Sequence, residues 1–274
     1  MVSPDDPDCV VTARAGCPVV LGVGFGENFV ASDVAALLPV TRRFIFVEEG
    51  DLARLTWHGI EIRDREGNLV NRPIKESELV ADAMDRGRYR HFMQKEIHEQ
   101  PRAVAETLED RVGEAQVFEQ AFGPEAAEIF SKTRAVQIVA CGTSYHAGLV
   151  AKYFIERLCG LPCMVEIASE FRYRAPVVPA DTLYVTISQS GETLDTLEAL
   201  RLAKKLDYLA YLGICNVPES ALVRESDLSL LTHAGPEIGV ASTKAFTTQL
   251  AALLMLVTAL GRCHGMSKQI EADL

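Results

Sequence analysis

Two short segments of this chain place serine, threonine and amide side chains directly before a helical pattern. The first, Cys141–Ser144 (CGTS), follows the apolar run AVQIVA, and the second, Ser188–Thr193 (SQSGET), follows TLYVTI. The open amides of a helix N-terminus and the positive end of its dipole attract an anion, and hydroxyl groups add donors without adding charge. The pattern predicts a site for a phosphate monoester.

Serine and threonine before a helix have a second explanation, because they are also the residues that most often cap a helix N-terminus. Two such segments after neighbouring strands favour a ligand site over capping, and the sequence leaves both open. The chain has no GxxxxGK[ST] motif, so no nucleotide-binding P-loop is predicted.

A third segment, Glu237–Lys244, leads into an apolar stretch at 245–260 and offers a further helix start. Lys244 would face either a ligand or solvent in the first helical turn, so we assign it no catalytic role. The GVGFG run at 22–26 lies among hairpin patterns rather than in a βαβ unit, and it therefore predicts a glycine-rich turn.

The composition limits the class of protein. The 274 residues carry 27 basic and 38 acidic side chains, a net charge of −11, with no long basic run, so we expect no nucleic-acid partner. Seven scattered cysteines favour a reducing, cytoplasmic setting. No cysteine or histidine spacing matches a zinc motif, so we expect no metal and no cofactor. The apolar stretch at 245–260 is too short to span a bilayer, which predicts a buried helix and no membrane partner.

The segments with candidate binding residues lie in the second half of the chain, and the predicted secondary structure changes along the sequence before them. From Cys17 to about Asn71, short β-branched and aromatic runs alternate with turn signals and predict antiparallel hairpins. Turns are expected at Glu49–Asp51 and Glu66–Asn68. Asn28–Leu38 is expected to form a helical turn or a short helix, with Ser32 or Asp33 as its cap.

A charge-rich helical pattern runs from Ser77 to about Arg111, and Gln100-Pro101 is expected to end one helix and start the next. After Gly123-Pro124, two apolar runs are each followed by a helical stretch, and a third apolar run, YLAYLGICNV, ends in a loop at Pro218. Repeated strand and helix predict a parallel α/β sheet, in which ligands bind at the carboxyl ends of the strands.

Several long motifs together resemble the first sugar-isomerase (SIS) domain of the glucosamine-6-phosphate synthase family. They are CGTS, EIASEFRYR, SQSGETLDT, ICNVPESALVRESD and EIGVASTKAFTTQ. The earlier GENFVASDVAALLPVTRRFIFVEEGD and YRHFMQKEIHEQP resemble the end of that family's glutaminase domain and its linker. The resemblance implies a flavodoxin-like parallel-sheet SIS domain at 126–268. A helical linker at 81–125 would precede it, after an antiparallel β-rich remnant of an N-terminal-nucleophile (type-2) glutamine amidotransferase domain at 1–80.

The family forms glucosamine 6-phosphate from fructose 6-phosphate and glutamine, on the route to UDP-N-acetylglucosamine. The resemblance implies that this chain binds fructose 6-phosphate or glucosamine 6-phosphate and forms a homo-oligomer through its SIS domains. The residues that it assigns to the phosphate are Thr143, Ser144, Ser188, Gln189, Ser190 and Thr193, and those that it assigns to the sugar are Val240 and Ser242.

The chain departs from the family pattern in what it lacks. The family's nucleophilic cysteine follows the initiator methionine, whereas Val2 follows Met1 here, and the RWATHG and NHNG segments are absent. The family's isomerising glutamate, ring-opening histidine and Schiff-base lysine belong to later segments and map to no residue here. We therefore expect an internal part of the family's chain, without catalytic residues and inactive alone.

Two alternatives stay open. One is a non-catalytic regulator that senses a sugar phosphate through an SIS domain, which the acidic charge and β-rich first third oppose. The other is a phosphosugar isomerase that acts alone and needs a local base, for which Glu170 and Glu192 are the candidates.

Overall fold

The computed structural model describes residues 1–16, 18–32, 34–76, 86–114, 116–218 and 220–274. The chain divides into two compact units, Met1–Asp85 and Arg86–Leu274. Each unit has its own sheets and its own apolar core.

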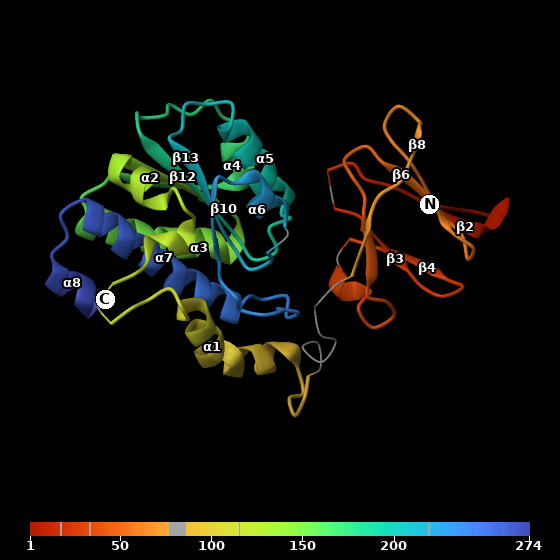
Figure 1. The fold of residues 1–274 in the computed structure, drawn as a ribbon, viewed down its shortest axis with the longest axis horizontal. Coiled ribbons are helices and arrows are strands. Elements are labelled where there is room, and N and C mark those ends of the chain that lie inside the picture. The colour runs from red at the N-terminus through yellow and green to blue at the C-terminus, as the bar shows by residue number, and fades with distance from the viewer. Residues whose placement is uncertain (17, 33, 77–85, 115, 219) are drawn as a thin grey trace. The chain divides into compact units, whose positions relative to one another are not determined.

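The Met1–Asp85 unit consists of two antiparallel sheets (Figure 1, red to orange). One sheet has the strand order β1-β2-β6-β7-β8 and the other β4-β3-β5-β9. The strands are β1 (Val2–Ser3), β2 (Asp6–Ala13), β3 (Val20–Val23), β4 (Asn28–Ala31), β5 (Arg43–Phe46), β6 (Leu52–Leu55), β7 (Ile60–Arg63), β8 (Leu69–Val70) and β9 (Ile74–Glu76).

Strand β6 of this unit alternates between buried and exposed side chains, as expected where one face of a sheet covers the core. In β6, Ala53 and Leu55 are buried while Leu52 and Arg54 are exposed. Between β5 and β6 lies the buried carboxylate of Asp51. The predicted antiparallel, β-rich first third is confirmed.

Two local expectations in this unit need correction. Of Asn28–Leu38, Val34–Ala36 does form a 3-10 helical turn, but Asn28–Ala31 pairs with β3 as a strand. The proposed cap Asp33 lies outside the described residues. Glu49–Asp51 joins strands of different sheets instead of closing a hairpin. The turn at Glu66–Asn68 does connect paired strands, with Gly67 at φ +86°.

The Arg86–Leu274 unit is built on a parallel five-stranded sheet with the order β11-β10-β12-β13-β14. This is the flavodoxin-like order, and it confirms the predicted parallel α/β sheet. The strands are β10 (Ala135–Ala140), β11 (Cys163–Ile167), β12 (Thr182–Ser188), β13 (Ala210–Cys215) and β14 (Leu228–Leu231).

Helices cover both faces of this sheet, so β10 and β12 are buried at every residue. On one face, α3 (Gly142–Phe154) and α7 (Lys244–Cys263) pack in the core, and α3 continues as a π-helical turn at Ile155–Cys159. On the other face lie α4 (Ala168–Phe171), α5 (Leu194–Ala203) and α6 (Ala221–Glu225) (Figure 1). The remaining helices are α1 (Phe92–Leu108), a 3-10 turn at Glu119–Phe122, α2 (Ala126–Lys132) and α8 (Lys268–Asp273).

Helix α1 corrects the expectation of two helices separated at Gln100-Pro101. Pro101 lies inside one continuous helix and has no N–H for the carbonyl of Ile97. The side-chain Nε2 of Gln100 donates to that carbonyl over 2.9 Å. The substitute hydrogen bond lets the helix pass through the proline. Residues 77–85 of the predicted helical stretch lie outside the described residues.

Helix α7 is the one helix in the described part of the chain that is long and apolar enough to cross a membrane. Most of its residues are buried inside the protein, where it packs against α1 and α3. The expectation of a buried helix at 245–260 is confirmed.

Candidate functional site

Both predicted phosphate-binding segments lie at the point where the strand order of the parallel sheet reverses. β10 and β12 are neighbours, with β11 beyond β10 on one side and β13 and β14 beyond β12 on the other. Ala140, the last residue of β10, is the register partner of Ile187 in β12. The segments that follow, Cys141–Ser144 and Ser188–Thr193, therefore leave the sheet side by side at its carboxyl edge. This switch point is where open α/β sheets bind ligands.

The first segment opens α3 without a side-chain cap. Cys141 is the N-cap residue and its side chain makes no capping hydrogen bond. Thr143 is exposed and Ser144 is buried in the first helical turn. Among the described residues, no hydrogen bond is recorded for either hydroxyl. The capping explanation fails for this helix, and its first amides stay open to an anion.

The second segment folds into a tight turn held by its own hydroxyl groups. The amide of Gly191 donates to Ser188 Oγ over 3.0 Å, and the amide of Glu192 donates to Ser190 Oγ over 3.2 Å. Ser188 Oγ and Thr193 Oγ1 are 3.4 Å apart. Thr193 is the N-cap residue of α5, yet its side chain makes no capping hydrogen bond. Ser190 accepts a bond in this turn, which leaves its hydroxyl hydrogen free to donate.

Gly191 is required for this turn. Its φ of +68° is unfavourable for residues with a side chain, and a Cβ at this position would lie 2.1 Å from Ser220 Oγ. The close approach brings α6 against the segment, where Leu222 N donates to Gly191 O over 3.1 Å. The turn is therefore held both by its own hydrogen bonds and by packing against α6.

The acidic side chains beside these segments are already engaged. Glu192 Oε1 accepts a hydrogen bond from the amide of Ala221, the first residue of α6, over 2.8 Å. Asp195 in the first turn of α5 pairs with Arg172 over 2.7 Å. Since Glu192 serves as a helix cap, it is a poor candidate for the general base of a self-sufficient isomerase.

Asn216 ties the second segment to the loop between β14 and α7. Its amide donates to Gln189 O over 3.3 Å, and its Nδ2 donates to Gly235 O over 2.8 Å. Its Oδ1 accepts from the amide of Ala234 over 2.7 Å. We missed Asn216 in the sequence, although a polar residue directly after the third apolar run was the signal that marked the other two segments.

The third predicted segment differs from the first two because a carboxylate already occupies its helix start. Glu237 Oε1 accepts from the amides of Thr243 and Ala245 over 2.8 and 3.1 Å. Ser242 Oγ donates to Glu237 Oε2 over 3.0 Å, and Val240 is fully exposed. The N-terminus of α7 is therefore not a second anion site.

Lys244 faces neither solvent nor an open site. It is 2% exposed, and its Nζ donates to Glu99 Oε2 of α1 over 2.7 Å. Burial by itself raises the pKa of Glu99, but the hydrogen bond and charge of Lys244, together with the charges of Lys95 and Arg102, hold that pKa below its ordinary value. Lys244 is a buried ion-pair residue that anchors α7 to α1.

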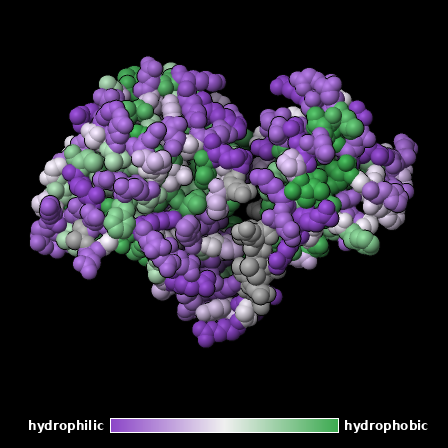
Figure 2. Space-filling view, viewed as in Figure 1, coloured by the Kyte–Doolittle hydropathy of each residue, from purple (hydrophilic) through white to green (hydrophobic). Residues whose placement is uncertain are grey.

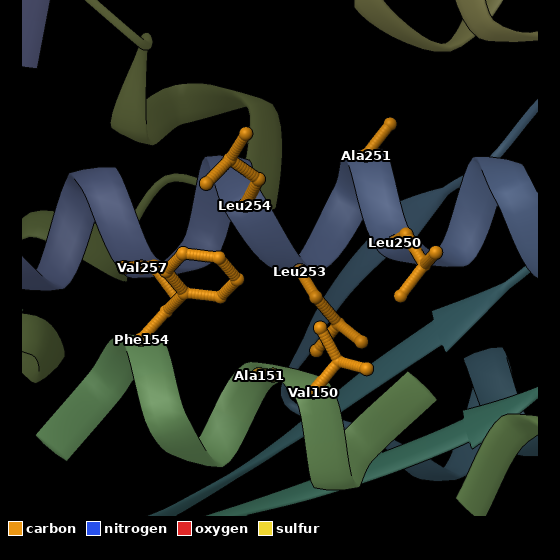
Figure 3. A pocket seen from close by; sticks show the side chains of 8 residues that line it. All are labelled: Val150, Ala151, Phe154, Leu250, Ala251, Leu253, Leu254 and Val257. Atoms are coloured by element: carbon orange, nitrogen blue, oxygen red, sulfur yellow. The ribbon is translucent and has the colours of Figure 1, made fainter. Parts of the chain in front are cut away.

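An apolar groove of about 270 Å³ lies between α3 and α7, away from these loops. Figure 3 shows Phe154 of α3 beside Val257 of α7, and Val150 beside Leu253. Its lining residues are Val150, Ala151, Phe154, Leu250, Ala251, Leu253, Leu254 and Val257. With no polar side chain in its wall, this groove does not suit a sugar phosphate.

The cysteines of the described chain are free thiols, and burial suppresses the reactivity of several. Burial raises the pKa of Cys159 and of Cys163 to about 12, and it also raises the pKa of Cys215 beside the second segment. Across the described ranges, no group of three or more His, Cys, Asp or Glu side chains could hold a metal ion.

Residues 129–259 match the family model described as the SIS domain. The chain contains an SIS domain. A glutamine–fructose-6-phosphate aminotransferase (isomerizing) from Pseudomonas putida is 59% identical over 275 residues, which cover 100% of this chain and 45% of the relative. The enzyme of the same description from Escherichia coli K12 is 58% identical over 268 residues, 98% of this chain and 44% of the relative.

Among solved structures, the C-terminal domain of glucosamine-fructose-6-phosphate aminotransferase from Francisella tularensis has a TM-score of 0.67 and 51% identity. The match covers 69% of this chain and 53% of that one. The resemblance recognised from the motifs is confirmed, and the SIS domain contains both loops at the switch point. The chain spans about 45% of the length of the curated relatives that it matches.

Proposed function

We propose that this chain is the sugar-phosphate-binding part of a glutamine–fructose-6-phosphate aminotransferase and binds fructose 6-phosphate or its product glucosamine 6-phosphate. The observation that carries the proposal is the placement of two hydroxyl-rich segments side by side at the switch point of the SIS sheet. Each segment opens a helix, α3 or α5, whose first amides have no side-chain cap. Open amides and neutral hydroxyl donors suit a phosphate dianion.

In this proposal the phosphate lies between the two segments and the sugar extends toward the loop before α7. Thr143, Ser144, Ser188, Gln189, Ser190 and Thr193 hold the phosphate, and Val240 and Ser242 line the sugar. We call the two segments Cys141–Ser144 and Ser188–Thr193 together the phosphate cradle. Ser188 is buried and accepts a hydrogen bond within its own turn, so it holds the shape of the cradle, while the more accessible Ser190 and Thr193 donate to the ligand.

For the rest of the chain we propose the domain organisation that the sequence motifs imply. Residues 1–80 are the C-terminal part of a type-2 glutamine amidotransferase domain, residues 81–125 are an interdomain linker, and residues 126–268 are the first SIS domain. The two antiparallel sheets of the first unit support the first assignment. The product enters UDP-N-acetylglucosamine synthesis in the cytoplasm.

We also propose a homo-oligomer that forms through the SIS domain. The apolar groove between α3 and α7, with Val150 and Phe154 partly exposed at its edge, is a surface that another protein subunit would cover. Light scattering over a range of concentrations tests this, because a monomer at every concentration contradicts it.

Calorimetric titration of the chain with fructose 6-phosphate and with fructose tests the proposed ligand. We expect saturable binding of fructose 6-phosphate and none of fructose over the same concentrations, because the cradle recognises the phosphate. Equal affinities for fructose 6-phosphate and fructose, or no binding of either, would contradict the proposal.

A further inference from the structure

A row of polar side chains on α1 and just after its end contacts the segment from Leu231 to Thr247. Its members within α1 follow one another at intervals of three, one and seven residues, so they share one side of the helix, and Arg111 follows the helix end. Thr107 and Arg111 bind the start of this segment, at the end of β14. Glu96 and Glu99 bind its later part, in the loop before α7 and at the first residue of α7. The contacts are Glu96 with the amides of Ile238 and Gly239, Glu99 with Lys244, Gln100 with Thr247, Thr107 with the carbonyl of Thr232, and Arg111 with the carbonyl of Leu231.

Glu96 is the member of this row that touches the loop closest to the proposed sugar-lining residues. Its Oε1 accepts from the amides of Ile238 and Gly239 over 2.6 and 3.1 Å, and its Oε2 accepts from Gly239 over 3.2 Å. The side chain is 2% exposed, and no ion pair is recorded for it among the described residues. Burying a carboxylate is unfavourable unless hydrogen bonds compensate, so these backbone amides are its compensation.

Gly239 allows the loop to approach α1 this closely. A Cβ at position 239 would lie 2.5 Å from Glu96 Oε2 and 3.4 Å from the Cα of Met93. A side chain at this position would therefore displace the Glu96 carboxylate from the loop amides. The next residue, Val240, is fully exposed, so the loop is fixed on its α1 side and open on the other.

We infer that Glu96 is a positioning residue for sugar recognition: it holds the backbone of residues 238 and 239 against α1, and thereby sets Val240 and Ser242 in place beside the sugar. This inference rests on the proposed binding of fructose 6-phosphate. It assigns Glu96 no contact with the ligand. Its role is to make the chain distinguish a sugar phosphate from phosphate alone.

The experiment compares Glu96→Ala and Glu96→Gln with Glu106→Ala, a control on the same helix whose carboxylate pairs with Arg102 at the surface. Gly239→Ala disturbs the same contact from the loop side. The first readout is amide hydrogen exchange at residues 238 and 239 in the full chain, measured by NMR. The second is the affinity for fructose 6-phosphate and for inorganic phosphate, with thermal melts to establish that each variant folds.

In Glu96→Ala we expect the two amides to lose protection, and fructose 6-phosphate to bind roughly tenfold or more weakly, the effect of losing hydrogen bonds to a charged group. Affinity for inorganic phosphate should stay within about twofold, because the cradle is intact. Gly239→Ala should act like Glu96→Ala. Glu96→Gln keeps an oxygen acceptor and should retain most of the preference for fructose 6-phosphate over inorganic phosphate. Glu106→Ala should match the parent chain in both affinities and in amide exchange.

Unchanged exchange at residues 238 and 239 in Glu96→Ala overturns the positioning role, as does an unchanged ratio of the two affinities. An equal loss for both ligands also overturns it, because that result indicates general damage to the domain. If the parent chain binds fructose 6-phosphate no better than inorganic phosphate, the proposed function is wrong and the positioning role is wrong with it. The exchange measurement separates these failures, since it reports on the contact without any ligand.

Discussion

The two units of the chain stabilise their sheets in different ways. In Arg86–Leu274, β12 is buried at all seven residues because helices pack on both faces of the sheet. In Met1–Asp85, β6 alternates between exposed and buried side chains, and the cores beneath the two sheets are small. The comparison indicates that apolar packing stabilises the second unit, whereas the first depends more on polar contacts such as that of Asp51 with Arg72.

The first unit also has apolar side chains on its surface. Figure 2 shows hydrophobic residues gathered on the visible face of the Met1–Asp85 unit, and Phe25, Phe46 and Trp57 are among its exposed apolar side chains. Exposed apolar groups of this kind mark surfaces that another protein part covers. The candidate site, by contrast, lies on the loops of the well-packed unit, where a rigid sheet positions it.

The largest effect is expected from removing a core side chain of the second unit. Phe130 of α2 is fully buried and packs edge-to-face on Phe122 at 5.3 Å between ring centroids. Phe130→Ala should lower the free energy of unfolding of this unit by about 3–5 kcal/mol. Far-UV circular dichroism during chemical denaturation measures it, because the α-helices described in the chain belong to this unit.

Tyr153→Ala is the control for Phe130→Ala, since Tyr153 is an aromatic side chain on α3 that is largely exposed. It should change stability by less than about 0.5 kcal/mol. Similar effects of the two substitutions would contradict the view that apolar burial dominates this unit.

A polar substitution tests the first unit. Asp51 is 2% exposed, and both of its oxygens accept from Arg72 over 2.9 Å. Asp51→Asn should cost about 3 kcal/mol, at the lower end for breaking a buried ion pair, because Arg72 also contacts Glu48. Fluorescence of Trp57, the single tryptophan, reports on this unit. An unchanged unfolding midpoint in Trp57 fluorescence would show that the ion pair adds little to the stability of this unit.

Asp51 also makes the first unit sensitive to acid. Burial alone raises the pKa of Asp51, but hydrogen bonds from Arg72 and the Glu48 amide, with the charges of Arg72 and Arg14, hold it below the ordinary 3.8. The ionised form is the stabilising one, so its contribution is complete above about pH 4 and is lost as the pH falls through the lowered pKa. Trp57 fluorescence should show this loss in the parent chain and not in Asp51→Asn.

A smaller effect is expected at the candidate site, on binding and not on folding. Ser190→Ala and Thr193→Ala should each weaken fructose 6-phosphate binding by about 5-fold to 150-fold, or ~1–3 kcal/mol, the range for hydrogen bonds to charged groups. Melting temperatures should stay near that of the parent chain. Ser131→Ala removes a surface hydroxyl that bonds only to Glu128 O, and it should leave the affinity unchanged. Lower melting temperatures at constant affinity would identify Ser190 and Thr193 as structural residues instead.

The smallest effect should be seen with thiol reagents. Burial raises the pKa of Cys159 and Cys163 to about 12, so at pH 8 almost none of either thiol is the reactive thiolate. We expect iodoacetamide to leave both unmodified in the native chain and to modify them after denaturation, as mass spectrometry of peptides would show. Modification of either residue in the native chain would indicate that the second unit opens more readily than its packing implies.

Much of the second unit could be predicted because local and tertiary signals agree there. A continuous apolar run such as Ala135–Ala140 is typical of a strand that is covered on both faces. The polar residues that follow such a strand lie at the carboxyl edge of the sheet. In the first unit the signals disagree. Asn28–Ala31 forms a strand only because β3 and the turn before it offer pairing partners, which are not evident from the segment itself.

The candidate site shows the same limit. The hydroxyls of the first two loops could be predicted, since they follow their strands directly. The pairing of Lys244 with Glu99 could not, because it depends on where the distant helix α1 packs against α7. The capping of α7 by Glu237 could not either, because it depends on how the loop before α7 folds back. The prediction at Pro101 was wrong for a local reason, since the compensating hydrogen bond comes from the neighbouring Gln100 side chain.

The most direct test of the central claim is the position of the phosphate in a crystal structure of the chain with fructose 6-phosphate. The account predicts phosphate oxygens within hydrogen-bond distance of the first amides of α3 and of the hydroxyls of Ser190 and Thr193. The sugar would then point toward residues 240–242. A phosphate bound at any other place, such as beside the apolar α3–α7 groove, would contradict the account.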